Sequence, residues 1–515
     1  LPYQDGTYPL GPSKYDKRGI AAFLPQWDST KCLQCNQCTF VCPHAAIRAY
    51  LVDEEEAAAA PAAFTTVPAK GAKGLQYRLQ VSTLDCTGCG SCAASCLSKD
   101  KALTMQPVDD TMYDETNWNY ALSLKDKPGV FDRKTLKGSQ FSQPLVEFSG
   151  ACAGCGETPY AKLITQLYGE KTYWVNGVGC SLAWAGAFPS LPYTKNKEGR
   201  GPAFYGTLFE DQAENGLGVV LATKQRRAYV KQVAQQLLPL VPGTELETAI
   251  HAWLSSFDDL DANDADARKL TAALESASLT GEAAELAEKL LKNKDQLGKK
   301  VVWLFGGDGW AYDIGYGGLD HVMASGEDIN VFVVDTEVYS NTGGQSSKAT
   351  PVGASAKFAD GGKKTAKKDL GRLMMTYPNV YVASVAMGAN PAQLMKAVTE
   401  AVAHKGPSIV IAYAPCINHG IKAGMNNVQA EMKKAVDCGL WPLYRYDPNK
   451  TEKPFSLDYK KPSVPVEEFF NGEVRYAGLK IKYPETAAKL FAEAQVEADT
   501  RYETYVALAH SYNKD

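Results

Sequence analysis

The stretch VVWLFGGDGW, residues 301–310, decides the fold of the larger part of this 515-residue chain. Its first five residues, Val301 to Phe305, are all apolar. A continuous apolar run is typical of a strand that is covered on both faces of a parallel sheet. The glycine-rich turn that follows places Asp308 at the carboxyl end of the strand, where open α/β sheets bind their ligands. We therefore predict an α/β domain with a ligand site at this edge of its sheet.

The same strand pattern recurs on both sides of this stretch. Apolar runs at residues 173–178, 329–334, 380–385 and 408–413 predict further strands, and helical segments separate them. Residues 221–300 are rich in Ala, Leu, Glu and Lys, which predicts a helical insertion. Packing of helices against one another is the simplest explanation of its apolar repeat, and a partner-binding arm is the alternative.

A second polar loop, DTEVYSNTGGQ at residues 335–345, follows the strand at 329–334. The two strand ends lie about one βαβ unit apart, so Asp308 and the loop at residues 336–341 should converge. The Asp308 carboxylate, the Thr336 hydroxyl and a main-chain carbonyl are the hard oxygen ligands that magnesium prefers, and two diphosphate oxygens and a water would complete its octahedron. Either motif alone is explained by a glycine-rich turn with a helix-capping aspartate. The two together favour a magnesium–diphosphate site.

Eight of the thirteen cysteines form two quartets with the spacing C-x2-C-x2-C-x3-C. In cluster domains of this kind, the first three cysteines hold one four-iron cluster and the fourth reaches across to the other. Zinc ribbons and disulfides are the alternatives, but two ordered quartets exceed what four-coordinate zinc needs. We predict that Cys32, Cys35, Cys38 and Cys96 hold one 4Fe-4S cluster, and that Cys86, Cys89, Cys92 and Cys42 hold the second.

Composition narrows the range of functions. The net charge is −4, and no basic stripe indicates binding to nucleic acid. The longest apolar stretches, such as residues 408–414, are too short to span a bilayer, so we expect a soluble, cytoplasmic protein. Because the sequence begins at Leu1 rather than at methionine, we expect a processed piece, a subunit or part of a longer polypeptide.

Three motifs make the resemblance to a known family specific. DGWAYDIG at residues 308–315, DTEVYSNTGGQ at 335–345 and CAGCGETP at 152–159 resemble the thiamine-diphosphate domain of the pyruvate:ferredoxin (flavodoxin) oxidoreductases. The resemblance covers essentially the whole chain and is to the carboxy-terminal part of the single-chain form, in which a dicluster domain also precedes the thiamine domain.

The resemblance implies roles for individual residues. Magnesium would be held by Asp308, Thr336 and the Val338 carbonyl, and a third, thiamine-proximal 4Fe-4S cluster by Cys152, Cys155, Cys180 and Cys416. Thiamine diphosphate would be bound by Glu157, Cys180, Gly307, Asp308, Gly309, Trp310, Thr336, Glu337, Val338, Tyr339, Ser340 and Asn341. Asn341 and Glu157 are the candidate catalytic residues. Cys438 is left over, and we interpret it as an inert small hydrophobic residue.

The predicted fold class is α/β, with a small α+β dicluster ferredoxin-like domain in front of a parallel-sheet domain that binds thiamine diphosphate. We predict a tether at residues 1–30, the dicluster domain at 31–110, a connector at 111–147 and the thiamine-diphosphate domain at 148–515, with the helical insertion near 221–300. His419, Asn418 and Arg200 are interpreted as structural hydrogen-bonding residues.

The function that the resemblance implies is oxidative decarboxylation of pyruvate with coenzyme A, which yields acetyl-CoA and CO2. Electrons would pass through three 4Fe-4S clusters to ferredoxin or flavodoxin. The glutamate that activates the aminopyrimidine, and the pyruvate pocket, are expected in amino-terminal domains or a partner chain, within a homodimer of the complete enzyme. The alternatives are an oxidoreductase for another 2-oxoacid and an electron-transfer iron–sulfur subunit without catalysis of its own.

Overall fold

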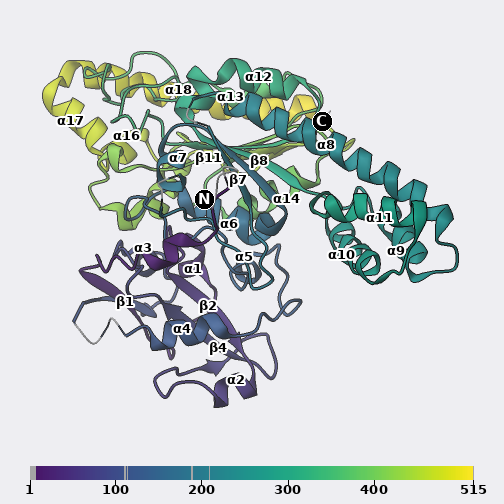
Figure 1. The fold of residues 1–515 in the computed structure, drawn as a ribbon. Coiled ribbons are helices and arrows are strands. Elements are labelled where there is room, and N and C mark those ends of the chain that lie inside the picture. The colour runs from purple at the N-terminus through teal and green to yellow at the C-terminus, as the bar shows by residue number, and fades with distance from the viewer. Residues whose placement is uncertain (1–6, 110–111, 113, 187–188, 208, 514–515) are drawn as a thin grey trace.

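The structure is a computed structural model, and it describes all residues except 1–6, 110–111, 113, 187–188, 208 and 514–515. Figure 1 shows a small domain in purple below a larger domain built around a twisted sheet. A helical arm, in teal, projects from the larger domain. The first six residues of the predicted tether lie outside the described residues. Among the helices that are described, none combines the length and the apolar character needed to cross a membrane.

The larger domain is organised by one sheet, which has eight strands within the described residues, in the order β13-β12-β10-β11-β9-β8-β6-β7. The six strands from β10 to β7 in this order run parallel, and β12 and β13 add an antiparallel edge. The strands are β6 (Thr172–Asn176), β7 (Ala203–Gly206), β8 (Val301–Gly307), β9 (Asn330–Asp335), β10 (Tyr381–Val385), β11 (Ser408–Tyr413), β12 (Tyr444–Tyr446) and β13 (Phe455–Leu457). The five predicted strands are confirmed to within two residues at each end, whereas the three short edge strands β7, β12 and β13 were not predicted.

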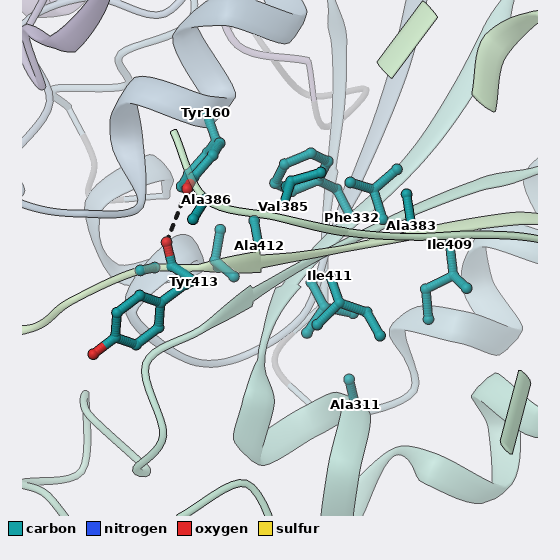
Figure 2. Close-up of a cluster of buried hydrophobic side chains, with 14 of the residues drawn as sticks. Tyr160, Ala311, Phe332, Ala383, Val385, Ala386, Ile409, Ile411, Ala412 and Tyr413 are labelled. Carbon is teal, nitrogen blue, oxygen red and sulfur yellow. Dashed lines mark hydrogen bonds between the residues drawn. The ribbon is translucent and has the colours of Figure 1, made fainter. Parts of the chain in front are cut away.

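Helices cover both faces of this sheet, which explains why β9, β10 and β11 are buried along their whole length. Figure 2 shows Tyr160 of α6 on one side of the strands and Ala311 on the other. Ala311 belongs to η6 (Gly309–Ile314), a single π-helical turn directly after β8. The helices of this domain are α5 (Leu136–Ser139), α6 (Thr158–Tyr168), α7 (Cys180–Ala185), α12 (Tyr316–Ala324), α13 (Leu370–Met374), α14 (Pro391–Ala403), α15 (Val428–Asp437), α16 (Val466–Phe470), α17 (Val474–Lys482) and α18 (Pro484–Asn513).

One buried hydrogen bond connects two distant parts of the chain at the ligand edge of the sheet. The Tyr160 hydroxyl donates to the Tyr413 carbonyl oxygen over 2.8 Å (Figure 2). It also accepts from the Met387 backbone N–H over 2.9 Å. Tyr160 lies in the first turn of α6, and Tyr413 ends β11. The loop before α6 and the loop after β11 are thereby held side by side.

The small domain contains two antiparallel sheets. One pairs β1 (Phe23–Trp27) with β5 (Leu103–Pro107), and the other has the order β2-β4-β3, formed by Ile47–Val52, Gln76–Val81 and Val67–Pro68. Its short helices are α1 (Gln37–Val41), α2 (Glu54–Ala58), α3 (Ser91–Ala94) and α4 (Thr116–Ser123). Cysteines belong to its apolar core together with a few large side chains. Such a domain depends on its metal clusters for most of its stability.

The edges of this domain differ from the predicted boundaries. Strand β1 lies inside the range predicted as a tether, yet it pairs along its whole length with β5. Helix α4 lies inside the predicted connector, and its Trp118 is buried in the core of the small domain. Pairing and packing of this kind join segments that are distant along the chain, so neither leaves a local signal in the sequence.

The helical insertion has an apolar core of its own. It consists of the second half of α8 (Gln212–Leu237) with α9 (Glu245–Ser255), α10 (Leu260–Ser276) and α11 (Gly281–Lys292). The Trp253 indole donates to the Leu297 carbonyl over 2.7 Å, which closes this core where the chain returns to β8. The first half of α8 packs on β8 and β6, so the helical segment begins earlier than predicted.

Candidate functional site

The predicted magnesium ligands meet at the carboxyl ends of β8 and β9. Asp308 is buried, and its Oδ1 accepts hydrogen bonds from the Thr336 backbone N–H at 3.0 Å and the Thr336 hydroxyl at 2.9 Å. Ser347 donates to the other carboxylate oxygen over 2.8 Å. Burial raises the pKa of Asp308 well above its ordinary value, and the nearby charge of Asp335 raises it further.

The spacing of these oxygens fits a magnesium ion. The Thr336 hydroxyl oxygen lies 2.9 Å from Asp308 Oδ1 and 3.0 Å from the Val338 carbonyl oxygen. Neighbouring ligands of an octahedral ion with bonds of 2.0–2.1 Å are about 2.9 Å apart. A divalent cation here would also supply the positive charge that a buried carboxylate needs to stay ionised. The donor set therefore fits the group that the sequence predicts.

The other predicted cofactor residues surround this position at different depths. A Cβ atom added at Gly309 would lie 2.5 Å from the ring of Tyr339, so glycine is needed for this close approach. A Cβ atom at Gly307 would meet only the Val334 carbonyl, at 4.0 Å, which leaves room beside the backbone. Trp310, Thr336, Glu337 and Val338 are buried, Tyr339 and Ser340 are partly buried, and Asn341 is exposed.

A buried network of charges supports the loop from behind, and sequence reasoning missed it. Arg475 forms ion pairs with Glu337 at 2.7 Å and Glu473 at 2.6 Å, and Lys367 pairs with Asp335 at 2.7 Å. Burial alone would raise the pKa of Glu337, but the charges of Lys367 and Arg475 outweigh it and lower that pKa to about 2. Because the partners come from separate segments, no local motif could have revealed them.

His419 and Asn418 act as structural hydrogen-bonding residues, as predicted. His419 is fully buried, and its Nε2 lies 2.7 Å from the Thr336 carbonyl oxygen. The Asn418 amide donates to the Ser340 carbonyl over 3.2 Å. Both contacts hold the loop that carries the candidate magnesium ligands.

The four dispersed cysteines come together beside this loop. Burial raises the pKa of the Cys155, Cys180 and Cys416 thiols, and the proximity of these cysteines to one another, and of Cys152 to Cys416, raises it further. Cys180 begins α7, and its Sγ lies 3.1 Å from the Ser340 hydroxyl oxygen. The structure therefore places the predicted third set directly against the candidate thiamine loop.

Glu157 lies among these cysteines. It immediately precedes α6, and its carboxylate accepts a hydrogen bond from the Trp184 indole over 3.0 Å. Burial raises the pKa of Glu157 to about 7, against the opposing effect of that hydrogen bond. Its charge acts on Cys155, Cys180 and Cys416. A carboxyl group in this setting can change its protonation state near neutral pH.

The eight cysteines of the two quartets line two small cavities in the small domain. One cavity is lined by Cys32, Cys35, Cys38 and Cys96, and the other by Cys42, Cys86, Cys89 and Cys92, so Cys42 and Cys96 each lie with the other quartet. No three His, Cys, Asp or Glu side chains of the described residues converge closely enough to hold a single metal ion. Thiols arranged around a cavity suit a cluster of several irons, in which each cysteine binds a different corner.

The third cysteine set and the set that contains Cys89 meet where the larger domain contacts the small domain. Burial raises the pKa of the Cys89 thiol, and the Gly154 backbone N–H, which lies beside the Cys89 sulfur, opposes that rise. His44 Nε2 lies 2.9 Å from the Ala151 carbonyl oxygen, next to Cys152. The three candidate clusters therefore form a series from the thiamine loop to the far side of the small domain. Cys438 is buried in the apolar core of the larger domain and belongs to none of them.

Comparison with known proteins gives two family matches. Residues 281–412 match the C-terminal TPP binding domain of thiamine pyrophosphate enzymes. Residues 24–47 match a 4Fe-4S binding domain. These ranges include the loops of Asp308 and Thr336 and the first cysteine quartet, respectively.

Curated relatives match nearly the whole chain. The pyruvate:ferredoxin oxidoreductase of Moorella thermoacetica is 53% identical over 98% of this chain and 44% of its own length. The pyruvate-flavodoxin oxidoreductase of Klebsiella pneumoniae is 50% identical over 98% of this chain and 43% of its own length. The mitochondrial pyruvate dehydrogenase [NADP(+)] of Euglena gracilis is 44% identical over 97% of this chain and 28% of its own length. The chain is thus related to the pyruvate:ferredoxin and pyruvate-flavodoxin oxidoreductases, and it spans less than half the length of these relatives.

Proposed function

We propose that this chain is the thiamine-diphosphate and electron-relay part of a pyruvate:ferredoxin or pyruvate:flavodoxin oxidoreductase. The complete enzyme would convert pyruvate and coenzyme A to acetyl-CoA and CO2 and pass two electrons to its acceptor. The observation that carries this proposal is the contact between the candidate thiamine loop and the third cysteine set. Cys180 Sγ and Ser340 Oγ, 3.1 Å apart, belong to these two sites.

In this proposal, Asp308, Thr336 and the Val338 carbonyl hold magnesium, and the diphosphate of the cofactor completes its coordination. When bound, thiamine diphosphate supplies stabilisation of the carbanion that forms when a 2-oxoacid loses CO2. The chain contributes position and electrostatics. His419 holds the Thr336 carbonyl, and the close contact of Gly309 with Tyr339 shapes the wall of the pocket.

The cysteine sets support a relay in a definite order. Electrons would leave through the set of Cys152, Cys155, Cys180 and Cys416, because it lies against the thiamine loop. The set with Cys89 follows, because the Gly154 backbone lies beside the Cys89 sulfur. The set with Cys96 is last and would reduce ferredoxin or flavodoxin. Four-iron clusters with low potentials suit a donor as reducing as a decarboxylated 2-oxoacid adduct.

The remainder of the enzyme is also part of the proposal. The relatives are more than twice as long as the matched region, which supports further domains or a partner chain that carry the activating glutamate, the substrate pocket and most of the coenzyme A site. We propose a cytoplasmic enzyme that works as a homodimer. The names of two relatives support ferredoxin or flavodoxin as acceptor.

The test uses the complete polypeptide, purified without oxygen. Reduction of ferredoxin should require pyruvate, coenzyme A and thiamine diphosphate together. A preference for 2-oxoglutarate over pyruvate would instead support an oxidoreductase for another 2-oxoacid. Failure to bind thiamine diphosphate, with intact clusters, would support an electron-transfer subunit. The 515-residue chain alone should bind the diphosphate half of the cofactor weakly and oxidise no pyruvate.

A further inference from the structure

A buried lysine of the larger domain reaches into the small domain, between the two cavities that the cysteines line. Lys162 lies on α6 and is only 2% exposed. Its ammonium donates to the backbone carbonyls of Thr39 and, at 3.0 Å, of Phe40. Both carbonyls belong to α1, the short helix between Cys38, which lines one cavity, and Cys42, which lines the other.

Among the described residues, most buried cations have a carboxylate partner, whereas Lys162 has none. Arg48 pairs with Glu147, Lys171 with Asp261, and Arg475 with Glu473. Arg227, like Lys162, donates to backbone carbonyls instead. Within the described part of the chain, the contacts of the Lys162 ammonium are carbonyl oxygens, and Arg48 adds repulsion.

An unpaired buried ammonium is costly, so its charge calls for compensation. Burial lowers the pKa of Lys162 to about 8, and the opposing negative charges are the thiolates of Cys42 and Cys38. Because burial raises the pKa of the Cys38 thiol, the charge that compensates Lys162 is that of the cysteine sulfurs when iron holds them as thiolates. With clusters in place, each set carries net negative charge in both oxidation states, because four thiolates outweigh the charge of the iron–sulfur core.

We propose that Lys162 is the counter-charge of the two clusters of the small domain and raises their reduction potentials. The inference rests on the proposed function, since it requires both clusters. A four-iron cluster gains one electron, and so one negative charge, when it is reduced. A fixed cation nearby, shielded from water, stabilises the reduced form more than the oxidised form. The cluster of Cys42 should be affected more strongly than that of Cys38, because the Cys42 thiolate is the stronger influence on Lys162.

Helix α6 links Lys162, beside the two clusters of the small domain, to the third cysteine set. Helix α6 begins one residue after Glu157, beside the third cysteine set, and Lys162 lies on its second turn. The larger domain thus provides the charge that makes the small domain a better electron acceptor. The Lys162 side chain thus joins the two domains and also adjusts the reduction potentials of the clusters in the small domain.

The experiment is a redox titration of the complete, cluster-loaded protein, followed by electron paramagnetic resonance. Lys162→Gln keeps a hydrogen-bond donor and removes the charge, whereas Lys162→Met removes both. Either variant should make reduction of the Cys42 cluster about tenfold less favourable, a shift of 59 mV toward more negative potential for one electron. Lys162→Arg should keep the potential close to the wild-type value, because it keeps the charge.

Lys171→Met is the matched control. Lys171 is also buried, but it follows the far end of α6 and pairs with Asp261. This variant should leave the potentials unchanged. If Lys162→Met fails to load clusters, Lys162→Gln decides. Unchanged potentials in Lys162→Gln would overturn the inference even if cluster loading fell, because a purely structural role predicts that result. Absence of the two cluster signals from the wild-type protein would instead refute the proposed function.

Discussion

Arg475 and Glu337 form an ion pair of 2.7 Å inside the larger domain, behind the loop that carries Thr336 and Val338. Glu337 has a φ of 61°, a left-handed conformation that is unfavourable for residues other than glycine and asparagine. The ion pair holds Glu337 in this conformation. On either side of it, the Thr336 hydroxyl contacts Asp308 and the Val338 carbonyl contacts that hydroxyl.

Replacing Arg475 with methionine should damage both stability and cofactor binding. Glu337 and Glu473 would keep buried charges without this partner, which costs about 3–5 kcal/mol. Thermal unfolding should occur at lower temperature, and affinity for magnesium–thiamine diphosphate should fall, as measured by calorimetry. Arg226→Met is the control, because Arg226 forms only a surface pair with Asp295 at 3.5 Å. Equal effects of the two variants would refute the role of Arg475.

Asp308→Asn should remove most of the affinity for thiamine diphosphate. The change replaces a charged candidate ligand by a neutral one of the same shape. Mutation of a residue that only hydrogen-bonds to a metal ligand typically costs about 10–100-fold in metal affinity. Because Asp308 would bind the metal directly, we expect a loss of about 100-fold or more. Iron content should not change. Asp320→Asn, at a carboxylate that accepts a hydrogen bond from Tyr377 over 2.8 Å on α12, should bind the cofactor normally.

Cys416→Ala should remove one cluster and leave two. Iron and acid-labile sulfide should each fall from about twelve to about eight per chain, since a four-iron cluster takes four cysteines. Resonance spectra of the reduced protein should lose the signal that is coupled to the substrate radical. Cys438→Ala, at a cysteine outside every set, should keep the full iron content. An unchanged iron count in Cys416→Ala would exclude Cys416 as a ligand.

Gly154→Ala should slow electron transfer between the third set and the small domain. Gly154 has a φ of +80°, and an added Cβ would lie 2.7 Å from both the Cβ and the carbonyl oxygen of Met425. The backbone must shift, which disturbs the contact with Cys89. Rapid-freeze experiments with pyruvate should show slower reduction of the clusters in the small domain. Gly199→Ala is the control, because Gly199 has a φ of +78° but no atom within 4 Å of the added Cβ.

The attachment of the helical insertion should weaken in acid. Asp264 of α10 pairs with Arg200 of the larger domain at 2.6 Å. Burial opposes ionisation, but Arg200 outweighs it and lowers the pKa of Asp264 to about 2. Because this pKa is below the ordinary value of 3.8, the pair stabilises the protein above pH 4. That stability is lost as pH falls toward 2.

Hydrogen exchange of α10, corrected for intrinsic rates, would measure this effect locally, which matters because clusters elsewhere are lost in acid. Between pH 5 and pH 3 the wild-type insertion should lose protection equivalent to about 1–2 kcal/mol, and Asp264→Asn should show a flatter dependence. Asp295→Asn should behave like the wild-type protein, since its partner Arg226 is half exposed. Identical pH profiles for wild type and Asp264→Asn would rule out this ion pair as the cause.

Features that depend on neighbouring residues could be predicted from the amino-acid sequence. Continuous apolar runs predicted five central strands, and the spacing of eight cysteines predicted two cluster loops together with the exchange of Cys42 and Cys96 between them. Asp308 and Thr336 could be paired from sequence because the ends of adjacent parallel strands meet at one edge. In each case the physical constraint acts over a few residues or one βαβ unit.

The tertiary structure alone decided the features that join distant segments. It placed Cys416 beside Cys155 through the bond between Tyr160 and Tyr413 and paired Arg475 with Glu337. It also buried Lys162 among the carbonyls of the small domain. Such contacts depend on how helices and loops pack on a finished sheet. The sequence carries no local periodicity or spacing for them, because their energy comes from burial and charge pairing that exist only after the chain has folded.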